Sequence, residues 1–433
     1  REIAEHCSQP GAGGRTPSDF PLARLDQSTV DRLAGDGRSV EDIYPLTPLQ
    51  AGMLFHSLVD AGSGAYLDQV GLTVDGVSDP RALGMAWQRV VDRTPILRSA
   101  LVWDGVDDPL QVVQRRAAIP TVYYDWRGLS DEDHDRELRR VLAENRAAGM
   151  DLTAAPLMRL AIADVAEGQA MLVWTWHHVV LDGWSLTQVF AEVCEQYAAI
   201  VEGRRPRLVS RRPFLSYLQW LARQDQREAE EFWRQVLSGF DSPTLLPFDR
   251  QAVEAHRAES SESVRVELPV EQSSRLHEVA KRNGLTPNTV VQGAWALLLS
   301  RYSGERDVVF GVTVSGRPAE LPGVEEMIGM FINTVPTRVQ VHNGQDVVSW
   351  LRRVQDAQVE SRRFDFISLG QLQARSQLPR GANQFDSVVE FANYPYDDTS
   401  GEDGPQVADA QMVDTTNFPL TLSAYLDDRF YFH

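Results

Sequence analysis

Trp174-Thr-Trp-His177-His178-Val-Val-Leu-Asp182-Gly183-Trp184-Ser185 is a segment in which one repeating pattern gives way to another. The residues that lead into it, from Met171 onward, are mostly apolar or aromatic, as in a buried strand. Beyond it, apolar side chains recur at the spacing of one helix face, at Leu186, Val189, Phe190, Val193, Cys194 and Tyr197. The segment therefore predicts a strand, a loop and a helix, with both histidines where the strand ends. A loop in this position presents side chains to a ligand while rigid elements hold it in place.

The two neighbouring histidines are expected to point in opposite directions, because successive residues on a strand alternate between its faces. We therefore do not expect His177 and His178 to share one role. The ordinary interpretation is a pair of core histidines whose hydrogen bonds are satisfied. Asp182, Gly183 and the position between strand and helix instead favour a functional site.

Two other kinds of site fit these residues poorly. A zinc site needs three or four converging His, Cys or carboxylate ligands, whereas the imidazoles diverge and the two cysteines, Cys7 and Cys194, are far apart in sequence. A serine hydrolase is expected to carry a Gly-x-Ser-x-Gly turn, which the sequence lacks, and Ser185 follows His178 too closely to be its nucleophile. We predict neither a metal site nor a serine triad.

Asp182 has two interpretations, a second catalytic acid or a structural charge, and we favour the structural one. A buried carboxylate is costly unless a cation compensates it. Three arginines are candidate partners: Arg317, Arg93 and Arg98. Gly183 is expected to allow a backbone conformation that other residues resist.

Composition restricts the class of protein. The chain has 433 residues, too many for one compact core, so two domains or lobes are expected. Its hydrophobic content of 43% is enough for ordinary globular folding. Its net charge of -19 argues against nucleic acids and anionic membranes as partners, because both are polyanions. No apolar run is long enough to span a bilayer, and no basic-then-apolar leader is present. Two cysteines do not make a disulfide framework, so a cytoplasmic protein is expected.

Both halves of the chain mix strand and helix patterns, which predicts an α/β (α+β) architecture. A first lobe is expected over residues 41–205, where Asp79 and Pro80 begin a helix. A second lobe is expected over residues 262–433, with a strand at residues 307–314 and a buried helix around the apolar run 294–299.

Two further segments lie outside the expected lobes. Residues 206–261 contain a helical pattern rich in Gln, Arg and Glu, which we expect to cross between the lobes. Residues 8–19 have the Gly, Pro and Ser content of a flexible linker.

The His-His-x-x-x-Asp-Gly pattern resembles the condensation domains of nonribosomal peptide synthetases, which belong to the chloramphenicol acetyltransferase-like superfamily. Six further motifs occur in the order that this family has. They are Tyr44-Pro-Leu-Thr-Pro-Leu-Gln50-Ala-Gly-Met-Leu-Phe-His56, Arg93-Thr-Pro-Ile-Leu-Arg98-Ser-Ala-Leu101, Tyr217–Trp220 with Phe232-Trp233, Val314-Ser-Gly-Arg317-Pro318, Ile328-Gly-Met-Phe-Ile-Asn333-Thr334 and Val389-Glu-Phe-Ala-Asn393-Tyr394-Pro395.

The resemblance implies two chloramphenicol acetyltransferase-like lobes in a V-shaped pseudo-dimer with a central tunnel. It also implies an acyltransferase that forms amide bonds, in which the amine of a downstream carrier-bound aminoacyl thioester attacks an upstream carrier-bound aminoacyl or peptidyl thioester. The domain would bind no cofactor of its own, because the substrates arrive on phosphopantetheine arms of two peptidyl carrier domains, with an adenylation domain adjacent. Residues 1–40 would then be a carrier-to-condensation linker, and the second lobe would be incomplete at its end.

The resemblance makes His178 the candidate catalytic residue, supported by His177, Asp182 and Gly183. His178 is expected to orient the amine, to take its proton or to hydrogen-bond the developing oxyanion, and the sequence leaves these three roles open.

Among the other motif residues, Arg317 is the preferred partner of Asp182 and Arg93 is the second choice. Candidates for the tunnel wall or for substrate contact are Trp184, Ser185, Asn333 and Trp233. For Asn333 the alternative is a loop-capping role, and for the two tryptophans it is a place in the core.

The sister classes of the family read differently at the histidine motif. Epimerisation domains tend to read Asp-Gly-x-Ser-Trp, and heterocyclisation domains carry paired aspartates in its place, whereas this chain reads Asp182-Gly183-Trp184-Ser185. The opening motif is closer to condensation domains that follow an epimerisation domain, which predicts a D-configured donor. Two alternatives remain open, a non-catalytic interaction module and a freestanding acyltransferase with a soluble acceptor.

Overall fold

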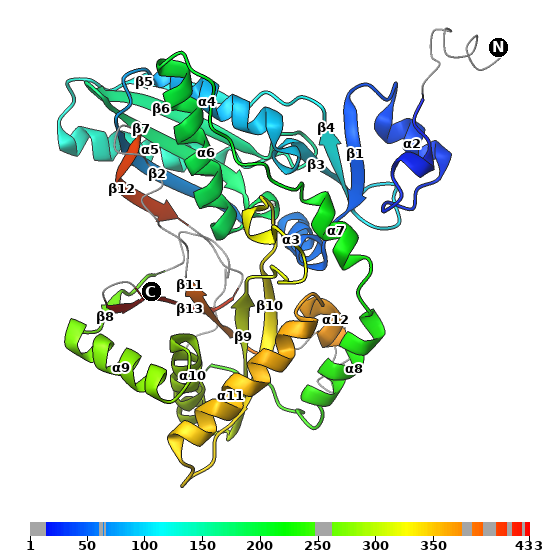
Figure 1. The fold of residues 1–433 in the computed structure, drawn as a ribbon, viewed down its shortest axis with the longest axis vertical. Helices are drawn as coiled ribbons and strands as arrows, with labels where there is room; N and C mark the ends of the chain where they lie inside the picture. Colours follow the sequence, from blue (N-terminus) through cyan, green and yellow to red (C-terminus); the bar gives the residue numbers. More distant parts are fainter. Residues whose placement is uncertain are drawn as a thin grey trace. The chain divides into compact units, whose positions relative to one another are not determined.

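The computed structural model describes residues 14–59, 64, 66–246, 262–374, 383–392, 404–413, 418–426 and 429–433, which form two compact units. The first unit contains the described residues of 1–223, 318–330 and 395–415, and the second contains those of 224–317, 331–394 and 416–433. Each unit combines helices with β-sheet, so the predicted α/β class is confirmed (Figure 1).

The first unit is built on a five-stranded sheet and a smaller three-stranded one. The larger sheet has the order β12 (Gln406–Val413), β2 (Leu67–Asp75), β7 (Gln169–His177), β6 (Met158–Ala166) and β5 (Thr121–Asp125). Its strands pair antiparallel except for β5 and β6, which are parallel. The smaller sheet has the order β1 (Val40–Pro45), β4 (Leu110–Gln114) and β3 (Ser99–Val102).

Helices cover both faces of the larger sheet because its strands alternate apolar side chains between the faces. On β7, Trp174 contacts Trp87 of α4 (Pro80–Arg93), with ring centroids 4.5 Å apart. Its neighbour Val173 packs in a cluster with Leu138 and Val141 of α5 (Asp131–Ala147). Helix α4 begins at the predicted Pro80, where the Asp79 carboxylate accepts hydrogen bonds from two backbone N–H groups.

The shorter helices of the first unit precede or follow these layers. They are α2 (Gln27–Ala34), α3 (Pro48–Val59) and α7 (Leu215–Leu221), with a 3-10 turn η3 at His178–Val180. The longest helix of the unit, α6 (Gly183–Val201), packs beside α4. Part of the segment expected as a linker is packed, since Phe20, Val30 and Ala34 are buried together with Val40 and Ile43. Residues 1–13 of that predicted linker lie outside the described residues.

The second unit contains a six-stranded sheet and five described helices, of which the three longest pack against the sheet. The strand order is β10 (Asn333–Gln340), β9 (Asp307–Val314), β11 (Ser387–Ala392), β13 (Leu420–Leu426), β14 (Phe430–Phe432) and β8 (Val266–Glu267). The helices are α8 (Gln226–Val236), α12 (Leu369–Ala374) and the three longest ones, α9 (Val270–Arg282), α10 (Pro287–Ser303) and α11 (Val347–Ser361). The core lies between Phe310 of β9 and residues such as Leu299 and Trp350 of α10 and α11.

Two expectations for the chain's second half need correction. The run 294–299 is not uniformly buried, because Leu297 and Leu298 are 39% and 47% exposed while Ala296 and Leu299 face the core. Also, the two units are not contiguous lobes, since β12 from late in the chain pairs antiparallel with β2 of the first unit. Strand pairing between distant segments depends on tertiary structure, which local periodicity does not contain.

No helix within the described ranges combines the length and the apolar character that crossing a bilayer requires.

Gly316 provides a test of the packing in the second unit. Its φ is +59°, and an added Cβ would lie 1.8 Å from the backbone oxygen of Phe331. We expect Gly316→Ala to lower the free energy of unfolding by about 1–3 kcal/mol more than Gly304→Ala, because only the first substitution adds a clash. Gly304 is the matched control, with φ +78° and open space around it. Urea denaturation followed by tryptophan fluorescence measures both, and equal losses would contradict the prediction.

Candidate functional site

The predicted strand, loop and helix around the histidines are all present. Strand β7 ends at His177, η3 follows at His178–Val180, and α6 begins at Gly183. Helix α6 begins there because Asp182 is its N-cap, with Oδ1 accepting a hydrogen bond from the Ser185 N–H at 2.8 Å. The histidines therefore occupy a short turn between two regular elements.

The pairing of β2 with β7 assigns each histidine to a face. Leu67 lies opposite His177, and Asp68 lies opposite Trp176. His178 is two residues beyond Trp176, so Asp68 and His178 are diagonal neighbours on one face, within reach of each other's side chains. His177 belongs to the other face, as alternation predicts.

His177 is buried in a neutral environment. Its Nδ1 accepts a hydrogen bond from the Val179 N–H at 3.2 Å, and its Nε2 lies 3.2 Å from Oγ of Ser57 on α3. Burial, together with the nearby His178, lowers the pKa of His177 to about 3. The imidazole is thus an uncharged structural group that ties the end of β7 to α3.

His178 is the more accessible histidine. Tyr66, just before β2, binds its backbone, and Asp68 of β2 binds its ring. The backbone N–H of His178 donates to the carbonyl oxygen of Tyr66 at 2.8 Å. Its ring Nδ1 lies 2.6 Å from Oδ2 of Asp68. The His178 side chain is 24% exposed, whereas that of Asp68 is 4% exposed. The turn therefore presents the imidazole of His178, whose Nδ1 is bound by the buried carboxylate of Asp68.

Sequence reasoning missed Asp68. Asp68 is the second residue of β2, which begins at Leu67. The available indication was a run of two polar residues, Asp68 and Gln69, in a strand that is otherwise mostly apolar. Assigning Asp68 to His178 also requires the register of β2 against β7, which no local pattern supplies.

Asp182 and Ser185 make hydrogen bonds that hold the motif loop, and the predicted contact of Ser185 with a tunnel or substrate stays a prediction. Asp182 is fully buried, and its backbone N–H donates to the carbonyl oxygen of Gly329 at 3.1 Å. The Ser185 hydroxyl also donates to that carbonyl oxygen, at 2.9 Å. Gly183 is the first helical residue of α6, so the predicted need for an unusual backbone at this position is wrong.

Two of the three candidate arginine partners pair with glutamates instead of Asp182. Arg98 is bound to Glu41 at 2.8 Å, and Arg93 is bound to Glu192 at 3.1 Å. Both glutamates lie in the same unit as the arginines.

Arg317 belongs to the second unit, where its guanidinium stacks over the ring of Phe331 at 4.0 Å. Asp182 belongs to the first unit. The predicted pairing of Arg317 with Asp182 therefore stays a prediction.

The remaining predicted residues make internal contacts. Asn333 donates to the carbonyl oxygens of Asp365 (2.6 Å) and Ile367 (2.7 Å), which fits its loop-capping alternative. Trp233 is buried, and its Nε1 donates to the Phe364 carbonyl at 2.9 Å.

Trp184, half-buried on α6, donates from Nε1 to the Glu325 carbonyl at 2.8 Å. This contact and those of Asn333 and Trp233 describe how the side chains are held, and the predicted roles in lining a tunnel stay predictions.

The opening motif supports the same turn through Gln50. This residue of α3 is fully buried, and its Nε2 donates to the Val179 carbonyl at 2.7 Å. Its Oε1 accepts from the Thr47 N–H at 2.9 Å. This buried amide satisfies one carbonyl oxygen of η3 and so helps to hold the turn that carries His178 in place.

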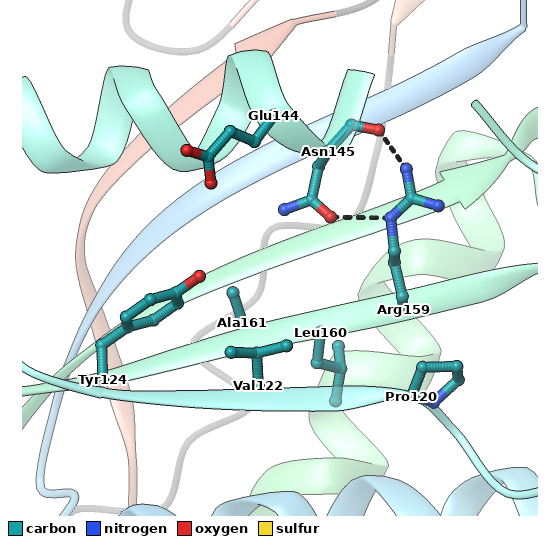
Figure 2. Close-up of a pocket in the computed structure, with 8 residues that line it drawn as sticks. All are labelled: Pro120, Val122, Tyr124, Glu144, Asn145, Arg159, Leu160 and Ala161. Atoms are coloured by element: carbon teal, nitrogen blue, oxygen red, sulfur yellow. Dashed lines mark hydrogen bonds between the residues drawn. The ribbon is translucent and has the colours of Figure 1, made fainter. Parts of the chain in front are cut away.

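A pocket elsewhere in the first unit is not a candidate reaction site. Figure 2 shows this pocket of about 140 Å³ between β5, β6 and the end of α5. Arg159 on its wall donates to Asn145 Oδ1 at 2.7 Å and to the Gly149 carbonyl at 2.6 Å. Glu144 is paired with Arg140 at 2.7 Å. Arg159 and Glu144 thus both have partners next to the pocket, and His178 does not line it.

Among the described residues, no group of three or more His, Cys, Asp and Glu side chains is arranged to hold a metal ion. Cys194 is buried in α6, and burial raises the pKa of its thiol to about 12. The thiol is therefore protonated at neutral pH and is a poor nucleophile.

Comparisons with known proteins agree with the resemblance. A family model described as Condensation domain matches residues 40–433. Linear gramicidin synthase subunits C and D of Brevibacillus parabrevis are each 42% identical over 98% of this chain, which spans 6% and 8% of their lengths. Chondramide synthase of Chondromyces crocatus is 36% identical over 98% of the chain, which spans 12% of its length. The chain thus corresponds to a small part of each of these relatives.

Solved structures share the fold. The starter condensation domain of rhizomide synthetase superposes with a TM-score of 0.73 at 21% identity, covering 90% of this chain and 88% of that one. The first condensation domain of the calcium-dependent antibiotic synthetase superposes with a TM-score of 0.73 at 21% identity, and the match covers 91% of each chain. The X-domain from teicoplanin biosynthesis, solved with OxyB, superposes with a TM-score of 0.73 at 24% identity, and the match covers 90% of this chain and 86% of that one. The chain therefore has the fold of these domains, as the resemblance implied.

His177 predicts a pH dependence of stability. Its pKa is about 3 in the folded chain and near 6.5 when unfolded, so the unfolded chain binds the extra proton between these values. Stability is therefore fully present above pH 6.5 and falls as the pH drops below it. Between pH 7 and 5 this loss amounts to about 2 kcal/mol, which His177→Asn should remove while keeping an acceptor for the Val179 N–H. Urea unfolding at both pH values measures it; parallel losses in both proteins would contradict the assignment.

The N-cap role of Asp182 predicts loss of stability rather than of chemistry. Asp182→Ala removes the acceptor for the Ser185 N–H and is expected to cost about 0.5–2 kcal/mol. Asp182→Asn keeps an acceptor and loses only the charge, so its melting temperature should fall less. Thermal unfolding by circular dichroism measures both variants. A normal melting curve for Asp182→Asn combined with abolished activity would instead indicate a catalytic aspartate.

Proposed function

The chain belongs to the condensation-domain family, and we propose that it forms an amide bond between two carrier-bound substrates. The donor is an upstream aminoacyl or peptidyl thioester, and the acceptor is the amine of a downstream aminoacyl thioester. The observation that carries this proposal is the accessible imidazole of His178, held by Asp68 and Tyr66 at the end of β7.

The reaction makes modest chemical demands on the protein. A thioester is already activated, and a free α-amine has a pKa of about 7.7–8.0, so much of it is neutral near pH 7.5. A general base contributes about 10²–10⁴-fold to the rate. Holding two reactants in attack geometry contributes more, with effective molarities of about 10⁵–10⁸ M. Positioning is therefore expected to supply most of the acceleration, and one histidine is enough for the proton.

The substrates and partners follow from the family. Both acyl groups arrive on phosphopantetheine arms of peptidyl carrier domains, an adenylation domain is adjacent, and the domain itself binds no cofactor. The place of action is the cytoplasm. The motif Tyr44–His56 supports the further proposal that the donor has the D configuration, because it is closer to domains that follow an epimerisation domain.

His178→Ala tests the proposal. We expect peptide transfer between the loaded flanking carrier domains to fall by about 10²-fold or more, because the group that handles the amine proton is lost. Single-turnover assays with D- and L-configured donors, analysed by mass spectrometry of the downstream carrier, measure both the loss and the donor preference. Asp75→Asn is the control, since Asp75 is an exposed residue at the other end of β2 and contacts Gln169.

Other outcomes would assign the chain differently. Wild-type transfer by His178→Ala would remove this histidine from the chemistry. Absence of transfer by the unmodified chain with both carriers loaded would favour a non-catalytic interaction module. Transfer to a free amine or alcohol without a downstream carrier would favour a freestanding acyltransferase. Equal rates with both donor configurations would contradict the D-donor proposal.

A further inference from the structure

We infer that Asp68 is a positioning residue, which holds the proton of His178 on Nδ1 and so makes Nε2 the atom that exchanges protons with the substrates. This inference rests on the proposed function and deepens it. It selects proton transfer from the three roles that the sequence left open for His178.

The hydrogen bond between the two residues is short and sheltered. Nδ1 of His178 lies 2.6 Å from Oδ2 of Asp68. Hydrogen bonds to a charged group are shorter than those between neutral groups, and this one is short even among them. The Asp68 side chain is 4% exposed, so water competes little for its carboxylate, whereas the imidazole is 24% exposed. A buried carboxylate is tolerated when a hydrogen-bonding cation or dipole compensates it, and here the His178 ring is that group.

The backbone makes this contact difficult to lose. His178 N–H donates to the Tyr66 carbonyl, two residues before Asp68, so one short segment holds both the backbone and the ring of His178. Tyr66 has a φ of +62°, a left-handed conformation that costs a non-glycine residue energy and persists only where its surroundings impose it. Strand β2 begins immediately after Tyr66, and its pairing with β7 then sets the distance between Asp68 and the histidine.

The acceptor character of Asp68 decides the tautomer. A carboxylate only accepts hydrogen bonds, so Nδ1 of His178 must be the protonated nitrogen, and in the neutral ring Nε2 carries the lone pair. His177 has the reverse arrangement, because its Nδ1 accepts a hydrogen bond from the Val179 N–H. Two adjacent histidines are thus held in opposite tautomers by different partners, which fits a structural role for one and a chemical role for the other.

In this scheme, one nitrogen, Nε2 of His178, first accepts and then returns the proton. The amine lone pair forms the new C–N bond at the thioester carbonyl, and the amine proton passes to Nε2 of His178. The ring is then an imidazolium, whose charge the Asp68 carboxylate stabilises through Nδ1–H. When the tetrahedral intermediate collapses, the C–S bond breaks with its electron pair on sulfur, and Nε2–H protonates that sulfur. The ring returns to its neutral form with its proton still on Nδ1.

The test compares Asp68→Asn with Asp75→Asn. Asparagine has nearly the size of aspartate but lacks the charge, and its amide can donate to Nδ1 and reverse the tautomer. Asp75 lies on the same strand and is exposed, with Gln169 Nε2 at 2.7 Å, so its substitution controls for a change of charge on β2. We expect Asp68→Asn to lower kcat by about 10²-fold or more with little change in KM for either loaded carrier. Asp75→Asn should retain wild-type kcat.

A spectroscopic measurement separates positioning from a merely structural role. In the wild-type chain labelled with ¹⁵N-histidine, the neutral form of His178, assigned by its absence in His178→Ala, should be protonated on Nδ1. Asp68→Asn should lose this signature. Because the wild-type spectrum alone answers the question, the inference remains testable even if Asp68→Asn fails to fold.

The outcomes distinguish this inference from the proposed function. An inactive His178→Ala with a fully active Asp68→Asn would overturn only the role of Asp68, as would a neutral wild-type ring protonated on Nε2. A fully active His178→Ala would overturn the proposed use of this histidine itself.

Discussion

The register of β2 against β7 is the constraint from which the arrangement of the candidate site follows. It places Leu67 opposite His177 and Asp68 opposite Trp176 along a pairing of nine residues in each strand. A slip by one residue would send every side chain of β2 to the other face, and the carboxylate would no longer reach the imidazole. The strands β12 and β6 on either side hold this pairing within the sheet, so the register depends on the whole layer.

Around this pairing, buried polar groups hold one turn by its backbone. Gln50 binds the carbonyl of Val179, Asp182 caps α6, and the carbonyl of Gly329 accepts hydrogen bonds from both Asp182 and Ser185. Such groups are costly when half satisfied, so together they specify one conformation. The aspartate, serine and glutamine that accompany the histidines in the motifs therefore hold the turn, which presents the partly exposed imidazole of His178.

The sequence predicts local features well and tertiary ones poorly. The apolar run before His177 and the helical spacing after Ser185 predict the elements on both sides of the turn, and alternation predicts that the two histidines diverge. By contrast, Asp68 is 110 residues from His178, and its role appears only when the strands are aligned.

The partners of Asp182 show a similar limit. The sequence predicts a buried, structural carboxylate at Asp182 with an arginine partner. Two of the candidate arginines, Arg93 and Arg98, instead pair with glutamates. A motif shows that charges must be balanced without showing which cation balances which carboxylate. The Gly183 interpretation fails for a related reason, because a helix N-terminus accepts glycine without requiring it.

The strand β12 has a consequence for how the molecule is made and recombined. Until residues 406–413 have been synthesised, β2 is the open edge of the sheet that carries Asp68, with its N–H and C=O groups unpaired on one side. Most of the chain must thus leave the ribosome before this layer closes, which slows folding and extends exposure to aggregation. An exchange of segments between synthetases that breaks the chain anywhere between residues 224 and 405 would join a β2 and a β12 with different evolutionary histories. Junctions before residue 40 or beyond residue 433 leave that pair intact.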